Sequence, residues 1–140
     1  MGIELTQEMR DRIDNALAEG NPVLIATASG SGMPDLVYKG SLMVFDSDHL
    51  AYWERALGTT LRNLKENPQV CVMYRNPQTR MAWKMFGVAE LHEGDATRDE
   101  VMNRTIQLEL DRDPERKGIG VVIRVDRVLE LGKETMRRDA

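Results

Sequence analysis

The sequence predicts a mainly β protein with flanking helices, an α+β fold in which antiparallel strands form a closed or partly closed barrel. Most apolar segments are short, rich in β-branched residues and separated by Gly, Pro, Asn or Asp, as in strands joined by tight turns. Helical spacing of apolar residues is confined to segments within 1–20, 59–66 and 95–113. There is no repeat, linker or low-complexity tract, so residues 1–140 are predicted to form a single domain.

The first predicted element is a helix within residues 1–20. Thr6 suits the N-cap position, and apolar residues recur at helical spacing from Met9 to Leu17. Gly20 suits the position just after the helix, and Pro22 prevents its continuation.

Strands joined by turns are predicted next. The run 23–28 is too brief and too β-branched for a helix, and the Ser- and Gly-rich segment 29–32 is a hairpin signal. The returning strand is expected over 36–44. A polar turn at 46–48 then leads to a strand over 50–53.

In the second half of the chain, two helices are predicted among three strands. A short helix is expected over 59–66, followed by strands over 69–74 and 80–91. A surface helix is expected within 95–113. The last strand is predicted over 119–131, where apolar and polar residues alternate. Residues 132–140 are expected to be a tail that is frayed over 137–140.

Composition narrows the function classes. Hydrophobic residues make up 41% and charged residues 30%, which is ordinary for a globular protein, and the net charge of −4 disfavours a nucleic-acid partner. No apolar run reaches the roughly 18 residues that a membrane span requires. The N-terminus lacks the order of a signal peptide, so a cytoplasmic location is expected. The single cysteine, Cys71, lies in an apolar run and is predicted to be a buried, inert thiol.

Residues 53–68 form the most concentrated candidate site. A strand end, a turn at Gly58 and a helix opening with Thr59 and Thr60 leave backbone N–H groups pointing outward, backed by the positive end of the helix dipole. Such a helix start binds phosphate well. The alternative interpretation is that Thr59 merely caps the helix.

Several motifs resemble those of one known family. Their order along the chain is Leu24-Ile25-Ala26-Thr27-Ala28, Gly32-Met33-Pro34, Leu61-Arg62-Asn63-Leu64, Asn67-Pro68-Gln69-Val70 and Gly87-Val88-Ala89-Glu90. Between about Thr6 and Leu131 the chain resembles the flavin-binding split β-barrel proteins related to pyridoxamine 5′-phosphate oxidase. Such proteins are typically homodimers that bind FMN in two grooves at the subunit interface.

The resemblance implies a set of cofactor-binding residues. Those expected beside the isoalloxazine ring are Tyr38, Lys39, Gly40, Ser41, Trp53 and Glu54. Thr59 and Thr60 match the pair that grips the phosphate. That pair is commonly basic in the family, and threonine supplies no charge. Arg55, Lys39 or Lys84 is expected to provide the compensating charge.

Other chemistry-bearing residues have plainer interpretations. Trp53 is favoured as a flavin neighbour, whereas Trp83 is expected at the dimer interface. Lys39 is either an edge lysine that prevents aggregation or a cofactor contact. His49 and His92 have no second histidine or cysteine at ligand spacing, so no metal site is expected.

No side chain stands out as a catalytic acid or base, which suits flavin chemistry because the cofactor carries the redox step. Lys39 or the backbone of Gly40 is a candidate for stabilising the reduced ring. The predicted function is therefore an FMN-binding oxidoreductase acting on a small molecule. The alternatives are a reductase that uses a deazaflavin coenzyme and a non-catalytic module that binds flavin or haem.

Overall fold

The computed structural model describes residues 2–139, so residues 1 and 140, at the ends of the predicted helical segment and of the tail, lie outside it. The elements, in chain order, are α1 (Gln7–Asp14), β1 (Val23–Ala28), β2 (Pro34–Lys39), β3 (Met43–Val44), β4 (His49–Glu54), α2 (Thr59–Glu66), β5 (Gln69–Asn76), β6 (Met81–His92), α3 (Ala96–Arg104), α4 (Gln107–Leu110), β7 (Ile119–Glu130) and β8 (Lys133–Arg137).

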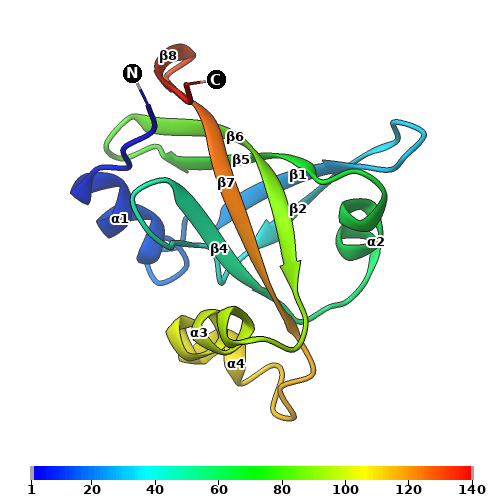
Figure 1. Cartoon of the computed structure of the whole chain (residues 1–140). Coiled ribbons are helices and arrows are strands. Elements are labelled where there is room, and N and C mark those ends of the chain that lie inside the picture. The colour runs from blue at the N-terminus through cyan, green and yellow to red at the C-terminus, as the bar shows by residue number, and fades with distance from the viewer. Residues whose placement is uncertain (1, 140) are drawn as a thin grey trace.

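The strands form one antiparallel sheet that curls into a half-barrel. Its order is β2-β1-β5-β6-β7-β4-β3, with β8 added beside β7. In Figure 1, α3 and α4 lie together at the end of the barrel opposite the two termini, and α2 lies to one side. This architecture confirms the predicted fold class. Because β2 and β3 end the sheet path, the barrel has an open seam there.

Two apolar clusters hold the elements together. The larger fills the barrel interior with inward residues of α1, β1 and β4 to β7, including Ile13, Ile25 and Ile123. The smaller lies on the other face of β4 and β7, where Trp53 packs with Val101 of α3 and residues near it. Strand β4 is consequently buried on both faces, which explains its nearly continuous apolar sequence.

The predicted bounds of two elements match those of β1 and α2. Helix α1 is shorter than the predicted segment: Thr6 caps it by accepting from the Met9 N–H, but it ends at Asp14. The strand predicted over 36–44 is also wrong as one element. It breaks after Lys39, because the Ser41 hydroxyl bonds both the N–H and the C=O of Trp53 in place of a regular ladder.

The C-terminal predictions need two corrections. The helix predicted within 95–113 is two helices, since Thr105 turns extended and its hydroxyl donates to the Val101 carbonyl, ending α3. The segment predicted as a tail contains a strand over 133–137, where β8 pairs with β7. Leu131 and Gly132 both have positive φ, of 50° and 85°, which is the geometry of a two-residue type I′ hairpin. Leucine is an unusual residue for such a turn, so this hairpin was not predicted from the sequence.

One face of the sheet is largely apolar and partly exposed in the single chain. Two rows of side chains cross β2, β1, β5 and β6 on it, following the strand registers. These rows are Leu36-Ala26-Cys71-Phe86 and Tyr38-Leu24-Met73-Lys84. Leu36 and Tyr38 are 62% and 67% exposed, and Cys71 is half-buried rather than buried as predicted. We call this set the outer face.

Within residues 2–139, the helices are all too short and too polar to cross a bilayer.

Trp83 does not lie on the outer face, and its expected place at a dimer interface is wrong. It points into the barrel, 1% exposed, and its ring stacks on Tyr74 with centroids 5.4 Å apart. Its indole N–H donates to Glu130 at 3.0 Å. The alternation along β6 puts odd-numbered residues inside from Trp83 to Ala89, which decides its orientation.

We therefore expect Trp83→Ala to lower the free energy of unfolding by about 3–5 kcal/mol, because it empties a large core volume. Trp83→Phe, which keeps most of the ring packing, should cost clearly less. Urea denaturation followed by circular dichroism measures both. An alanine variant as stable as the native chain would contradict the assignment of Trp83 to the core.

Candidate functional site

A cavity of about 540 Å³ lies at the open seam of the half-barrel. Its walls come from β2, the end of β4, the start of α2 and the region of α4, which are brought together from both ends of the sheet path. The predicted site residues that line it are Tyr38, Lys39, Gly40, Trp53, Glu54, Arg55, Thr59 and Thr60. Ser41 is not among the lining residues; it is buried and bonded to the backbone of Trp53. We call this cavity the groove.

The start of α2 opens onto the groove without a side-chain cap. Its N-cap is Gly58, so the capping role weighed for Thr59 is wrong. By contrast, α1 and α3 are capped by the side chains of Thr6 and Asp95. The first N–H groups of α2 have no carbonyl partners within the helix, as at every helix start. They are therefore suited to an anion.

A further cation, Arg62, lies beside this turn. Arg62 donates to the Thr59 hydroxyl oxygen at 2.9 Å. The hydroxyl keeps its own proton, which it can donate to a ligand. The spacing from Thr59 to Arg62, three residues on a helix, was the available signal for this contact.

Lys39 and Glu54 join the two sides of the seam. The Lys39 ammonium lies 3.0 Å from Glu54 Oε1, and Glu54 is fully buried. The other carboxylate oxygen accepts the Leu57 N–H at 3.0 Å. Lys39 Nζ also lies 5.2 Å from the ring centroid of Tyr52. Lys39 is thus an ion-pair partner within the groove wall, a role that neither of its two sequence interpretations included.

Arg55 has an acidic partner that sequence reasoning missed. Its Nε lies 3.3 Å from Glu109 of α4, which is only 8% exposed. Glu109 and Arg112 both line the groove. Lys84 does not: it lies on β6, with its ammonium 5.9 Å from the ring centroid of Phe86.

Asp113 fixes Trp53 in the groove wall. It is only 8% exposed, and its carboxylate accepts from the Trp53 indole N–H at 2.9 Å and from the Gly118 N–H at 2.9 Å. Burial alone raises the pKa of Asp113. The N–H donors of Lys117, Gly118 and Trp53 and the nearby Arg116 charge outweigh burial, so its pKa lies below the usual value.

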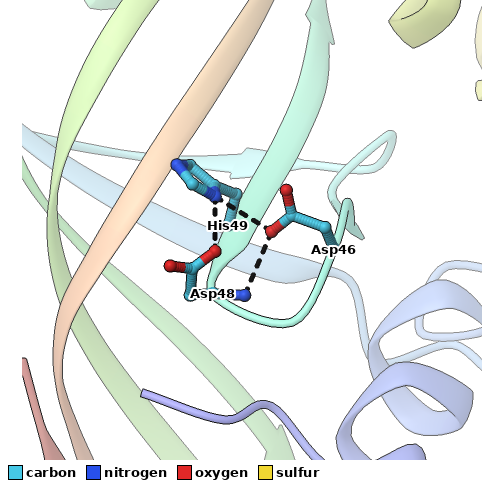
Figure 2. A group of neighbouring side chains, drawn as sticks. All are labelled: Asp46, Asp48 and His49. Atoms are coloured by element: carbon cyan, nitrogen blue, oxygen red, sulfur yellow. Dashed lines mark hydrogen bonds and ion pairs between the residues drawn. The ribbon is translucent and has the colours of Figure 1, made fainter. Parts of the chain in front are cut away.

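A second polar group lies in the turn between β3 and β4, shown in Figure 2. His49 Nδ1 is 2.9 Å from Asp46 Oδ1 and 2.8 Å from Asp48 Oδ1. Asp46 also accepts the Asp48 N–H at 3.0 Å, and Asp48 pairs with Arg138. These contacts tie the turn to itself and to the end of the chain, and we assign the group to that structural role.

Comparison with known proteins establishes the family. The family model described as pyridoxamine 5′-phosphate oxidase matches residues 8–129. This chain belongs to that family. The match confirms the resemblance found in the sequence motifs.

Individual relatives agree with this membership. An uncharacterised protein of Methanocaldococcus jannaschii is 28% identical over 92% of this chain and 82% of its own. A solved structure from Lactobacillus delbrueckii, described as a putative pyridoxamine 5′-phosphate oxidase, is 26% identical with a TM-score of 0.70, covering 90% of this chain and 93% of that one. Group A Streptococcus HupZ shares the fold, with a TM-score of 0.73 at 22% identity over 96% and 98% of the two chains.

Two more distant folds carry informative descriptions. One is an FMN-binding protein of Nostoc punctiforme, with a TM-score of 0.63 at 11% identity over 85% and 78% of the two chains. The other is an F420 reductase, with a TM-score of 0.60 at 18% identity over 78% and 89%. At these identities the likeness shows the fold alone.

Asp113→Asn is expected to lower the free energy of unfolding by about 1–3 kcal/mol at pH 7, because an amide cannot accept from all the donors that meet the carboxylate. The folded pKa of Asp113 lies below its unfolded value. Its stabilisation is therefore present above the unfolded pKa and is lost as pH falls through the folded one.

Urea denaturation between pH 2 and pH 7 measures this dependence. The variant should lose less stability than the native chain on acidification. Asp111→Asn, which removes an exposed carboxylate two residues away, is the control and should resemble the native chain. Equal acid slopes for native and Asp113→Asn chains would refute the role of this carboxylate.

Proposed function

We propose that this protein is a homodimeric FMN-binding flavoprotein, an oxidoreductase that passes hydride or electrons between a reduced donor and a small molecule. The observation that carries the proposal is the uncapped start of α2, which opens with two threonines onto a groove of about 540 Å³. A groove of this size is in the range of small-molecule sites. Family membership and the FMN-binding description of a structural neighbour support the same cofactor.

The groove residues fit the parts of FMN. The phosphate would be held by the N–H groups at the start of α2 and the hydroxyls of Thr59 and Thr60, with Arg55 lining the same cavity and Arg62 on Thr59. The ring would lie along Tyr38 to Gly40, with Trp53 in the opposite wall. Ser41 would act indirectly, by fixing the backbone of Trp53.

When bound, the flavin would supply the redox chemistry itself. The chain's own contribution is to bind and orient it. Lys39 would present its ammonium to the ring as half of a neutral pair with Glu54, so its electrostatic effect is weaker than that of a free lysine.

A second copy of the chain is the proposed partner. The outer face is largely apolar across β2, β1 and β5, and exposed apolar patches of this kind mark interaction sites. Tyr38 belongs both to this face and to the groove wall. A dimer built on the outer face would therefore border each groove, consistent with a cofactor at the interface.

The F420 reductase among the structural neighbours favours a deazaflavin coenzyme as the second candidate. Such a coenzyme carries a longer anionic tail and needs extra basic residues around its groove. Lys39 and Arg55 are already paired with acids, which favours FMN instead. A non-catalytic flavin- or haem-binding module would use the same groove without turnover.

Titration of the purified protein with FMN, followed by quenching of flavin fluorescence, tests the cofactor. We expect saturable quenching, weakened about tenfold or more in Arg55→Ala and in Thr60→Val because each loses a phosphate contact. Thr97→Val on α3, outside the groove, is the matched control and should bind like the native chain. No quenching by the native protein would defeat the FMN proposal, and tighter binding of the deazaflavin coenzyme would favour the second candidate.

Light scattering coupled to size exclusion tests the dimer. The native chain should elute as a dimer, and Leu36→Glu should elute as a monomer because it puts charge into the outer face. Leu131→Glu changes a residue that is 67% exposed in the β7–β8 turn and should remain dimeric. A native monomer, or a dimeric Leu36→Glu variant, would rule out the outer face as the interface.

A further inference from the structure

The groove carries balanced charge, which is unusual for a site offered to a phosphate. Its basic residues are Lys39, Arg55 and Arg112, and its acidic residues are Asp35, Glu54 and Glu109. Lys39 is held by Glu54 through a buried ion pair. Arg55, in the turn that leads to Thr59, is held by Glu109. An anion that enters this groove near Thr59 therefore meets two cations, Lys39 and Arg55, that already have acidic partners.

The Glu109 side chain lies between Arg55 and Gly40, which belong to two different walls of the groove. Glu109 comes from α4, and its side chain is only 11% exposed. One carboxylate oxygen lies 3.3 Å from Arg55 Nε. The other lies close to Gly40: a Cβ added there would be 3.1 Å from it. The absence of a side chain at Gly40 lets this carboxylate reach across the groove.

We propose that Glu109 is a specificity-determining residue that competes with the ligand's phosphate for Arg55, an inference that rests on the proposed FMN function. The Nε–H of Arg55 points to one acceptor at a time. A bound phosphate either displaces the Glu109 carboxylate from Arg55 or lies near it, and like charges repel. In both cases Glu109 lowers the affinity for the phosphate and leaves the uncharged part of the ligand unaffected.

This competition defines the ligand class. For a flavin with a single phosphate, Glu109 lowers the affinity through that one group. For riboflavin, which has no phosphate, Glu109 does not lower the affinity. For a coenzyme with several negative charges in its tail, the loss of affinity caused by Glu109 is the largest. Glu109 thus selects for ligands of low charge, and the threonines at the start of α2 bind phosphate without adding charge of their own.

The test compares FMN with riboflavin on three forms of the full chain, freed of bound flavin. In Glu109→Gln, which keeps the length of the side chain but removes its negative charge, the Kd for FMN should fall about tenfold, because the neutral amide competes less well for the Arg55 guanidinium and does not repel a phosphate. The Kd for riboflavin should stay within about twofold of the native value. Asp111→Asn removes one negative charge beside α4 without lining the groove, and should change neither Kd.

The possible outcomes distinguish the proposed role of Glu109 from the proposed binding of FMN. If the native chain binds FMN but Glu109→Gln binds it no tighter, or tightens FMN and riboflavin equally, the role of Glu109 is overturned and the FMN proposal stands. If the native chain binds neither flavin, both fall. Glu109→Asp keeps the charge but withdraws it from Arg55, so it should tighten FMN less than Glu109→Gln does; it replaces the glutamine variant if that chain does not fold by circular dichroism.

Discussion

The ion pair between Lys39 and Glu54 is the contact on which the seam of this half-barrel depends. No backbone ladder joins β2 to β4, so side chains must close the gap between the two ends of the sheet path. A fully buried carboxylate is costly unless it is paired, and Glu54 has both an ammonium at 3.0 Å and the Leu57 N–H at 3.0 Å. The turn that follows β4 is thereby fixed, and with it the start of α2 and the threonines of the groove.

The hydroxyl of Tyr52 is the buried side-chain atom without a hydrogen-bond partner among residues 2–139. Burial, with a smaller contribution from the charge of Glu54, raises the pKa of Tyr52 well above its usual value, so it stays neutral. The ring packs in the barrel core and faces Lys39, whose ammonium is therefore held by an aromatic face as well as by a carboxylate.

The sequence predicted correctly those helices and strands whose bounds are set by residues close together in the chain. The β-branched run of β1 and the threonine-to-Asn-Pro span of α2 carry their own boundaries, and both were predicted correctly. The break after Lys39 was missed because it depends on Ser41 meeting Trp53, twelve residues away. The same limit applies to the groove. The groove residues of the turn between β4 and α2 were predicted from their order in the chain, whereas Glu109 reaches Arg55 from a helix more than fifty residues downstream.

The position of Tyr38 matters for binding measurements on this protein, because its side chain belongs to two surfaces. It stands on the uncovered sheet face and also lines the groove. In the dimer that we propose, the second copy covers that face and changes the surroundings of the groove, so the proposed dimerisation and cofactor binding would be thermodynamically linked. With that linkage, an apparent dissociation constant measured for the groove would depend on the concentration of the protein, and the proposed cofactor would shift the equilibrium between monomer and dimer.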